Sequence, residues 1–291
     1  MTSSRDVGVV LVHGGWTDGS SWSPLVPIQP HGSERPFFCV HAVSGNVLCY
    51  RALASRLGAQ QPFYALQARG LEDGQEPQTD VAAMARDYVA AVRSVQSHGP
   101  YLLGGWSVGG LIAFEMARQL QAQGEEIRLL ALFDTPAPNG EEESVDEASL
   151  LASFALNLGL SREQLQTAAD AFSQAQTEDP LSFLLEYGKA ARIIPSDLSL
   201  ARLRQQFRVF NANVGVARSY KAAGPPANIA LFRAAERPSG AGADATLGWA
   251  RLGLKKIDVH DVPGDHLTMM REPFVSVLAA RLADCLPRKG T

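Results

Sequence analysis

The stretch that most constrains this chain is residues 101–117, which read YLLGGWSVGGLIAFEMA. Its first residues are apolar and predict a buried strand, and the residues after the second glycine pair suit a helix that stops at Gly124. Between them stands Ser107, flanked by Gly105 and Gly109. So sharp a turn strains the serine backbone, and neighbours without a Cβ make it feasible. We therefore expect the Ser107 hydroxyl to project from the carboxyl edge of a sheet, at the positive end of a helix.

Short apolar runs along the chain predict the strands of that sheet, namely residues 7–12, 37–41, 63–67, 101–103, 129–133, 229–232 and 257–259. Stretches that suit helices separate most of these runs, for example residues 50–57, 81–95 and 110–123. Apolar strands without alternation, joined by helices, are typical of a parallel sheet covered on both faces. We predict an α/β fold with a mostly parallel central sheet flanked by helices, which binds ligands outside the carboxyl ends of its strands.

Two regions interrupt this rhythm and set the predicted boundaries. Residues 19–36 hold four prolines, so they are expected to be an extended connector and neither a helix nor a central strand. The sheet pattern stops over residues 138–222, which are predicted to form a helical lid insertion above the serine. The predicted organisation is an N-terminal extension with the connector at 1–36, a core in two parts at 37–137 and 223–291, and the lid between those parts.

One lid helix has a clear pattern. Its apolar residues alternate in steps of three and four, at Leu200, Leu203, Phe207, Phe210, Val214 and Ala217. The same segment carries four arginines, at positions 202, 204, 208 and 218. These arginines indicate either a solvated outer face or a basic surface for an acidic partner or a phosphate.

Composition excludes several other classes of protein. A net charge of −4 argues against a nucleic-acid surface. Three cysteines, Cys39, Cys49 and Cys285, do not make a disulfide framework, and Cys39 is expected to be an inert core thiol. No apolar run has the length of a membrane span or the pattern of a signal peptide, so the reducing cytoplasm is the expected location.

A serine hydroxyl becomes a nucleophile at neutral pH only beside a base, and that base needs an acid to orient it. His266 lies in a loop just past the last predicted strand and follows the serine in the order that strand-turn-helix hydrolases require. His260, at the end of that strand, is expected to be structural. Two acids remain open, Asp134 after the strand that follows the serine helix and Glu236 after the next strand. Asp265 is too close to His266 in sequence to be preferred.

An oxyanion hole requires two backbone N–H donors. Val108, at the start of the serine helix, is predicted to supply one. The second is expected from a loop after an early strand, and residues 13–16 (HGGW) compete with residues 41–46 (HAVSGN). Chain position favours the second loop, because it leads directly into the helix, the strand and the serine turn that follow.

Several stretches resemble one family, the thioesterase domains that end nonribosomal peptide and polyketide synthetases. The core stretches are residues 22–30 (WSPLVPIQP), 38–50 (FCVHAVSGNVLCY), 99–110 (GPYLLGGWSVGG) and 132–135 (LFDT). The lid stretches are residues 157–160 (NLGL) and 193–197 (IIPSD). The likeness runs from about Trp22 to the C-terminus, and these motifs are specific when taken together.

The resemblance implies an α/β-hydrolase fold with a helical lid. It also implies release of an acyl or peptidyl chain from the phosphopantetheine thiol of a carrier protein. The family's nucleophile matches Ser107, its acid Asp134, its base His266 and its first oxyanion donor Val43, with Val108 as the second.

The sequence departs from the family pattern in two places. The family usually has Pro and Gly where this chain has Ala42 and Ser44, so the loop is expected to differ in stiffness or shape. Residues 1–21 instead resemble the opening strand and His-Gly-Gly-Trp loop of other α/β-hydrolases. No carrier domain with its attachment serine is found, so an excised terminal domain or an enzyme acting on a carrier in trans is expected.

These features predict a serine thioesterase that forms an acyl-serine ester and releases its chain by hydrolysis or macrocyclisation. Its expected partners are an acyl or peptidyl carrier protein and a small-molecule acyl chain, with no nucleic acid, no membrane and no metal or redox cofactor. A carboxylesterase or lipase acting on oxygen esters is the main alternative. A non-catalytic binding module on a hydrolase scaffold is the other.

Overall fold

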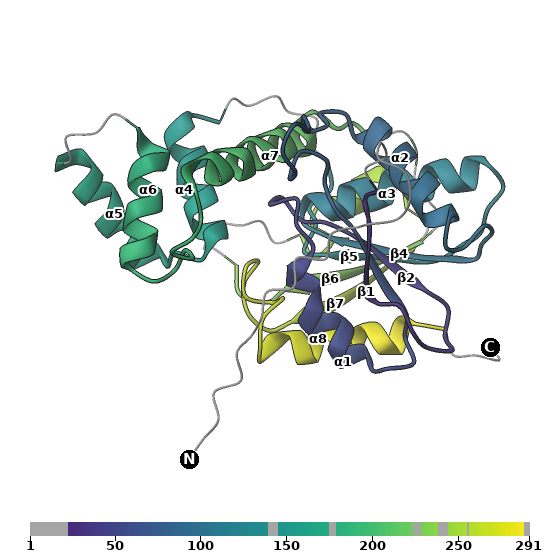
Figure 1. Ribbon diagram of the computed structural model, residues 1–291. Coiled ribbons are helices and arrows are strands. Elements are labelled where there is room, and N and C mark those ends of the chain that lie inside the picture. The colour runs from purple at the N-terminus through teal and green to yellow at the C-terminus, as the bar shows by residue number, and fades with distance from the viewer. Residues whose placement is uncertain are drawn as a thin grey trace, which may run out of the picture.

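The computed structural model describes residues 23–138, 145–174, 179–222, 224, 228–237, 244–254 and 256–287. Within these residues seven strands form one sheet in the order β1-β3-β2-β4-β5-β6-β7, with β1 antiparallel to β3 and the other pairs parallel. The strands are β1 (Leu25–Gln29), β2 (Phe37–Val40), β3 (Phe63–Leu66), β4 (Tyr101–Trp106), β5 (Ile127–Phe133), β6 (Asn228–Ala234) and β7 (Lys256–Val262). The predicted α/β fold with a mostly parallel sheet is confirmed (Figure 1).

Helices cover both faces of the sheet. One face carries α1 (Arg51–Leu57) and α8 (Phe274–Cys285), and the other carries α2 (Val81–Arg93) and α3 (Val108–Ala122) (Figure 1). Two short 3₁₀ helices, η1 (Leu48–Tyr50) and η2 (Trp249–Leu252), lie in connections. This layering explains why the strand sequences are apolar without a polar alternation.

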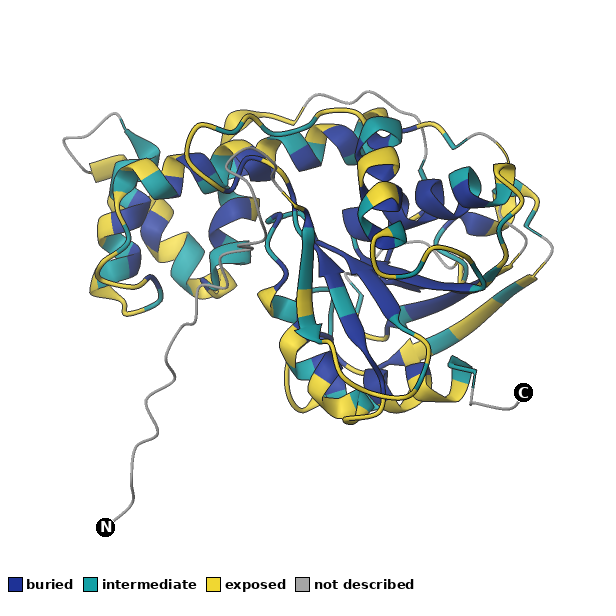
Figure 2. Ribbon diagram, turned by 45° about the vertical axis from the view of Figure 1, so that its right-hand side comes forward, coloured by how far each residue is buried: buried dark blue, intermediate teal, exposed yellow. Residues whose placement is uncertain are grey.

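The two faces of the sheet have separate cores. In β2, Phe38 and Val40 pack with α2 and α3, whereas Phe37 and Cys39 pack with α1 and α8. All four side chains are buried, as are the central strands as a whole (Figure 2). Because Cys39 is buried, the pKa of its thiol is raised well above the ordinary value, in keeping with the inert thiol expected there.

The predicted lid region contains four described helices, α4 (Glu147–Leu158), α5 (Arg162–Gln174), α6 (Pro180–Ala190) and α7 (Leu200–Ser219). They pack around an apolar cluster of their own, in which the Phe154 ring lies 5.1 Å from Phe207 and 5.3 Å from Phe210, measured between centroids. Side-chain caps at Asp146 and Ser199 begin α4 and α7. Among the described residues, no helix has the length and apolar character needed to cross a membrane.

Three of the four lid arginines contact other parts of the chain. Arg204 forms a 2.7 Å ion pair with Asp179, and Arg208 lies 3.7 Å from Glu76. Arg202 donates to the carbonyl oxygen of Leu71. These contacts favour the interpretation of the arginines as an intramolecular and solvated face.

The edge strand β1 lies inside the segment expected to be only a connector. Leu25, Val26 and Pro27 pair with β3, and the register shifts between Pro27 and Gln29. A proline-containing segment forms a strand here because edge position leaves one side of the backbone unpaired. The predicted strand at residues 7–12 falls outside the described residues.

The strand before Ser107 is longer than the apolar run at 101–103 indicated. Gly104 and Gly105 pair with β2 and β5, so the glycines continue the strand to Trp106 instead of ending it. A Cβ on Gly104 would lie 2.6 Å from the Phe37 ring. The glycine is therefore required by close packing between strands.

Candidate active site

The turn between β4 and α3 places Ser107 in a strained backbone conformation, with φ 57° and ψ −125°. Its N–H donates to the carbonyl oxygen of Phe133 at 3.0 Å. A Cβ on Gly109 would lie 2.5 Å from the carbonyl oxygen of Val40 and 2.3 Å from that of His41. The glycine allows the first turn of α3 to lie directly against the end of β2.

Thr135 connects the serine turn to the end of β5. Its hydroxyl lies within donating distance of two carbonyl oxygens, Ser107 at 3.1 Å and Phe133 at 3.2 Å. A Cβ on Gly110 would lie 2.1 Å from that same hydroxyl oxygen. The second glycine pair of the serine motif thus makes room for this threonine.

Asp134 and His266 meet at the carboxyl edge of the sheet. Asp134 follows β5 and is only 4% exposed, and its Oδ2 lies 2.7 Å from His266 Nδ1. With Nδ1–H donating to the carboxylate, Nε2 is the acceptor nitrogen of the ring. The His266 ring packs against Trp106, the residue before Ser107, with centroids 5.5 Å apart. The imidazole therefore lies beside the strained serine turn.

The environment of Asp134 keeps its carboxylate ionised. Burial raises its pKa, but the hydrogen bond and charge of His266, the Ala234 N–H at 3.0 Å and the Arg237 guanidinium lower it by more. The net pKa lies below the ordinary value for aspartate. Arg237 Nη1 contributes a direct contact, 2.9 Å from Oδ1.

Asp265 holds the loop that carries His266. Its Oδ1 accepts from the N–H of Leu267 at 3.0 Å and from the N–H and hydroxyl of Thr268, both at 2.8 Å. These bonds turn the backbone around His266. Asp265 therefore supports the loop and does not contact the imidazole as the acid.

Glu236, the other candidate acid, is exposed and lies in the connection that follows β6. Its N–H donates to the carbonyl oxygen of Gly264 at 3.0 Å. Among the described residues, the carboxylate that contacts His266 is that of Asp134. The next residue, Arg237, is the one from this connection that reaches the Asp134 carboxylate.

The loop at residues 41–46 contains a hydrogen-bonded turn. The carbonyl oxygen of Ala42 accepts from Gly45 N–H at 2.9 Å and from His41 Nδ1 at 2.7 Å. The Tyr88 hydroxyl donates to His41 Nε2 at 2.8 Å. Burial lowers the pKa of His41 to about 4, so the ring is neutral at physiological pH. These bonds fix the plane of the Ala42–Val43 peptide and direct Val43 N–H away from the turn.

Tyr50 holds this loop and the serine turn at a fixed separation. Its buried hydroxyl donates to the carbonyl oxygen of Val40 at 2.5 Å and accepts from Trp106 N–H at 3.1 Å. Val108, the first residue of α3, has an N–H without an acceptor inside the helix. The competing loop at residues 13–16 lies outside the described residues.

The remaining predictions concern His260 and the cysteines. The His260 ring stacks on Phe232 with centroids 4.9 Å apart, and its Nε2 lies 3.5 Å from Cys285 Sγ. His260 lies on β7, and these contacts with β6 and α8 agree with the structural role expected of it. The three cysteines are free thiols.

A family model described as the thioesterase domain matches residues 35–285. The chain belongs to the thioesterase domain family. The match spans the sheet from β2 onward, the lid, and the positions of Ser107, Asp134 and His266. The family membership inferred from the sequence motifs is thereby confirmed.

Relatives of this thioesterase are much longer proteins. Malpinin synthetase of Mortierella alpina is 44% identical over 156 residues, 52% of this chain and 2% of that protein. The inactive atromentin synthetase invA3 of Paxillus involutus is 30% identical over 253 residues, 86% of this chain and 26% of the relative. Nonribosomal peptide synthetase btyA of Aspergillus terreus is 29% identical over 279 residues, which are 92% of this chain and 30% of that protein. The chain therefore spans less than a third of the length of each of these relatives.

Solved structures give the same family. The four-domain nonribosomal peptide synthetase holo-AB3403 matches with a TM-score of 0.80 and 28% identity, over 92% of this chain and 20% of that one. The NocB thioesterase domain matches with a TM-score of 0.65 and 23% identity, over 90% of this chain and 98% of that one. The thioesterase thus has the α/β-hydrolase fold.

Four residues at this thioesterase site were not predicted to belong to it. Asp265 and Thr268 form a local Asx turn whose spacing was visible in the sequence. Arg237 stands next to Glu236, just after a strand. The sequence does not show that the side chain of Arg237, and not that of Glu236, points toward Asp134. Tyr50 contacts Trp106 across 56 positions in the chain, a relationship without a local sequence signal.

Proposed function

We propose that this thioesterase releases an acyl, peptidyl or polyketide chain from a carrier protein through an acyl-Ser107 intermediate. The observation that carries the proposal is the 2.7 Å contact between His266 Nδ1 and buried Asp134, beside the strained Ser107 turn. Nucleophile, acid and base then follow three strand ends, in the chain order expected of this fold. Asp134 holds the imidazole in the tautomer that leaves Nε2 free to accept a proton.

In the first step, His266 Nε2 takes the proton of the Ser107 hydroxyl as Oγ attacks the thioester carbonyl carbon. The C–S bond then breaks, and His266 returns the proton to the departing pantetheine sulfur. The product is an ester between the chain and Ser107. Asp134 stabilises the imidazolium formed in between without itself taking the proton.

The oxyanion of each tetrahedral intermediate is held by the N–H groups of Val43 and Val108. The Ala42–Val43 peptide is oriented by two hydrogen bonds to its carbonyl oxygen, and Tyr50 fixes its distance from the serine turn. Such preorganised donors stabilise developing charge without reorganisation during the reaction.

The second step transfers the chain from Ser107 to a nucleophile. His266 removes a proton from water, or from a hydroxyl or amine of the chain itself, as the new bond forms. Ser107 Oγ leaves and recovers a proton from His266, giving an acid, a macrolactone or a macrolactam. The lid helices α4–α7 decide among these products by excluding water and folding the chain.

The similarity to synthetases supports a carrier-bound substrate, because such enzymes carry their intermediates as phosphopantetheine thioesters. The test is a panel of acyl-pantetheine thioesters with matched oxygen esters. We expect an acyl adduct on Ser107 by intact-protein and peptide mass spectrometry, and turnover that favours the thioesters. Turnover of only the oxygen esters would instead support the carboxylesterase alternative. No adduct and no labelling by a fluorophosphonate would support a binding module.

A further inference from the structure

Helix α7 leaves the lid and lies directly on the loop at residues 41–46. A Cβ on Gly45 would approach Val209 Cγ1 of α7 to 2.6 Å, and Gly45 itself has a φ of +80°. Val209 is fully buried in a small cluster with Ala68 and Leu71. Close packing and backbone conformation therefore both require glycine at this position.

One polar side chain of α7 reaches the same loop. Asn213 is 1% exposed, and its Nδ2 donates to the carbonyl oxygen of Val43 at 2.9 Å. A buried amide stays in the fold only when its hydrogen-bonding groups find partners. The partner here is 170 positions away, at the residue proposed to donate to the oxyanion.

The hydrogen bond from Asn213 means that the peptide groups on both sides of Val43 are held in place. The peptide before it is held at the carbonyl oxygen of Ala42 by Gly45 N–H and His41 Nδ1. The peptide after it is held at the carbonyl oxygen of Val43 by Asn213. With both planes fixed, rotation about the Val43 backbone bonds is restricted, and the direction of its N–H is set.

We propose that Asn213 is a positioning residue for the oxyanion donor, so that the last lid helix takes part in catalysis. This role rests on the proposed function, since it needs Val43 N–H to contact the substrate oxygen. Asn213 acts through Val43 and does not itself touch the reacting atoms.

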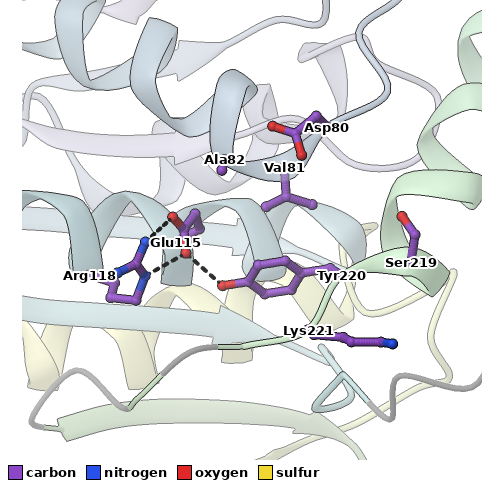
Figure 3. A pocket seen from close by; sticks show the side chains of 8 residues that line it. All are labelled: Asp80, Val81, Ala82, Glu115, Arg118, Ser219, Tyr220 and Lys221. Atoms are coloured by element: carbon purple, nitrogen blue, oxygen red, sulfur yellow. Dashed lines mark hydrogen bonds and ion pairs between the residues drawn. The ribbon is translucent and has the colours of Figure 1, made fainter.

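Other contacts hold α7 to the core and keep Asn213 in register. Gln205 Nε2 donates to the carbonyl oxygen of Glu72 at 2.5 Å. Just past the other end of the helix, the Tyr220 hydroxyl donates to Glu115 on α3 at 2.8 Å, and Arg118 holds the same carboxylate (Figure 3). Glu115, Arg118 and Tyr220 line a pocket of about 240 Å³ where the end of α7 meets α2 and α3. Both ends of α7 are therefore fixed to the core.

The test compares Asn213→Leu, which keeps similar volume and loses the donor, with Asn211→Leu on the exposed face of the same helix. We expect Asn213→Leu to lower the acylation rate at saturating thioester by about 10- to 100-fold, part of the loss caused by removing one donor outright. The thioester concentration giving half the maximal rate should stay within about twofold. Asn211→Leu should match the wild type.

A second readout reports the oxyanion hole itself. A substrate-like boronic acid forms a tetrahedral adduct with Ser107 that places an oxygen at the donors. Its inhibition constant should rise in Asn213→Leu by the same factor as acylation slows, since both report transition-state binding. If the role of Asn213 were purely structural, Asn213→Leu would lower the melting temperature and weaken substrate binding. The inhibition constant would then not rise by the factor by which acylation slows.

Several outcomes overturn the proposal. A folded Asn213→Leu enzyme with wild-type acylation, or with a loss confined to substrate binding, would remove the role while the proposed function stands. A wild type that forms no acyl-Ser107 would overturn the function and this role with it. If Asn213→Leu does not fold, Asn213→Ser, whose short hydroxyl cannot reach Val43, serves instead. The same selective loss is expected from it, and normal acylation would overturn the proposal.

Discussion

Arg237 and Asp134 form a 2.9 Å ion pair through the carboxylate oxygen that His266 leaves free. The guanidinium helps to hold the pKa of Asp134 below its ordinary value. The site needs Asp134 as a carboxylate, because the ionised form orients the imidazole and stabilises the imidazolium. Arg237 therefore bears on the pH at which the site becomes active.

We expect Arg237→Gln to move the acidic limb of the kcat/KM profile to higher pH, because loss of the guanidinium raises the pKa of the Asp134 carboxyl. Arg237→Lys, which keeps the charge, should restore most of the original limb. Arg233→Gln is the matched control, because Arg233 pairs with Asp261 on β7 and not with Asp134. An unmoved limb in Arg237→Gln would show that this charge does not act on the site.

Removal of the Ser107 hydroxyl should abolish covalent chemistry. Ser107→Ala is expected to lose about 10⁶-fold in turnover, as other serine triads do. Incubated with an acyl thioester, the wild type should gain the acyl mass and the variant should not. Ser55→Ala, at an exposed position on α1, should acylate normally. Stoichiometric adduct on Ser107→Ala would identify a different nucleophile.

The two candidate acids can be separated by amide substitutions. Asp134→Asn keeps the shape of the carboxylate but favours the wrong imidazole tautomer, so kcat should fall by about 10⁴. Glu236→Gln alters an exposed side chain and should leave kcat within about twofold. Steady-state kinetics on both variants decides the matter. A severe defect in Glu236→Gln alone would reverse the assignment.

Burial of His41 makes stability depend on pH. Its pKa is lowered from 6.5 to about 4, so the unfolded chain binds more protons than the folded one between those values. The contribution of His41 to the free energy of unfolding should therefore be complete above pH 6.5. The free energy of unfolding should fall by up to about 3 kcal/mol as the pH drops to 4. Urea denaturation at a series of pH values between 4 and 7 measures this change in the free energy of unfolding.

The control variant for this prediction is His41→Gln, which should be less stable at pH 7 and should lose the share of the pH slope that His41 supplies. A slope that persists unchanged in His41→Gln would assign the pH dependence to other groups.

Residues 1–21 are predicted to be dispensable for acylation. A chain beginning at Trp22 retains every described strand and helix, including β1. It should fold and form the acyl-enzyme at a rate close to that of the full chain. If the folded truncation acylates about 10²-fold more slowly, the loss expected for one oxyanion donor, the loop at residues 13–16 belongs to the site.

Local patterns predicted those features whose physical cause is also local. The serine turn and α3 follow from the glycines around Ser107, and most strands follow from uninterrupted apolar runs. Strand β1 was missed because Pro27 argues against a strand unless an edge position is known, and edge position depends on the whole sheet.

Long-range contacts had no comparable signal. The choice between Asp134 and Glu236 could not be made from the residues alone, because both follow parallel strands at the same edge of the sheet. The family resemblance favoured Asp134, and the 2.7 Å contact with His266 gives a physical reason for that choice. The Asn213 contact with Val43 depends on how the lid docks, and its sequence pattern marks only a buried helix face.

The borders of the sheet have a consequence for self-association. In edge strand β1, Pro27 has no N–H to offer to another strand, and the register shift after it bends the backbone. At the opposite border, β7 exposes the charged side chains Lys256, Asp258 and Asp261. An incoming strand would meet an interrupted ladder on one side and charges on the other. Both borders thus resist the edge-to-edge pairing by which open sheets aggregate.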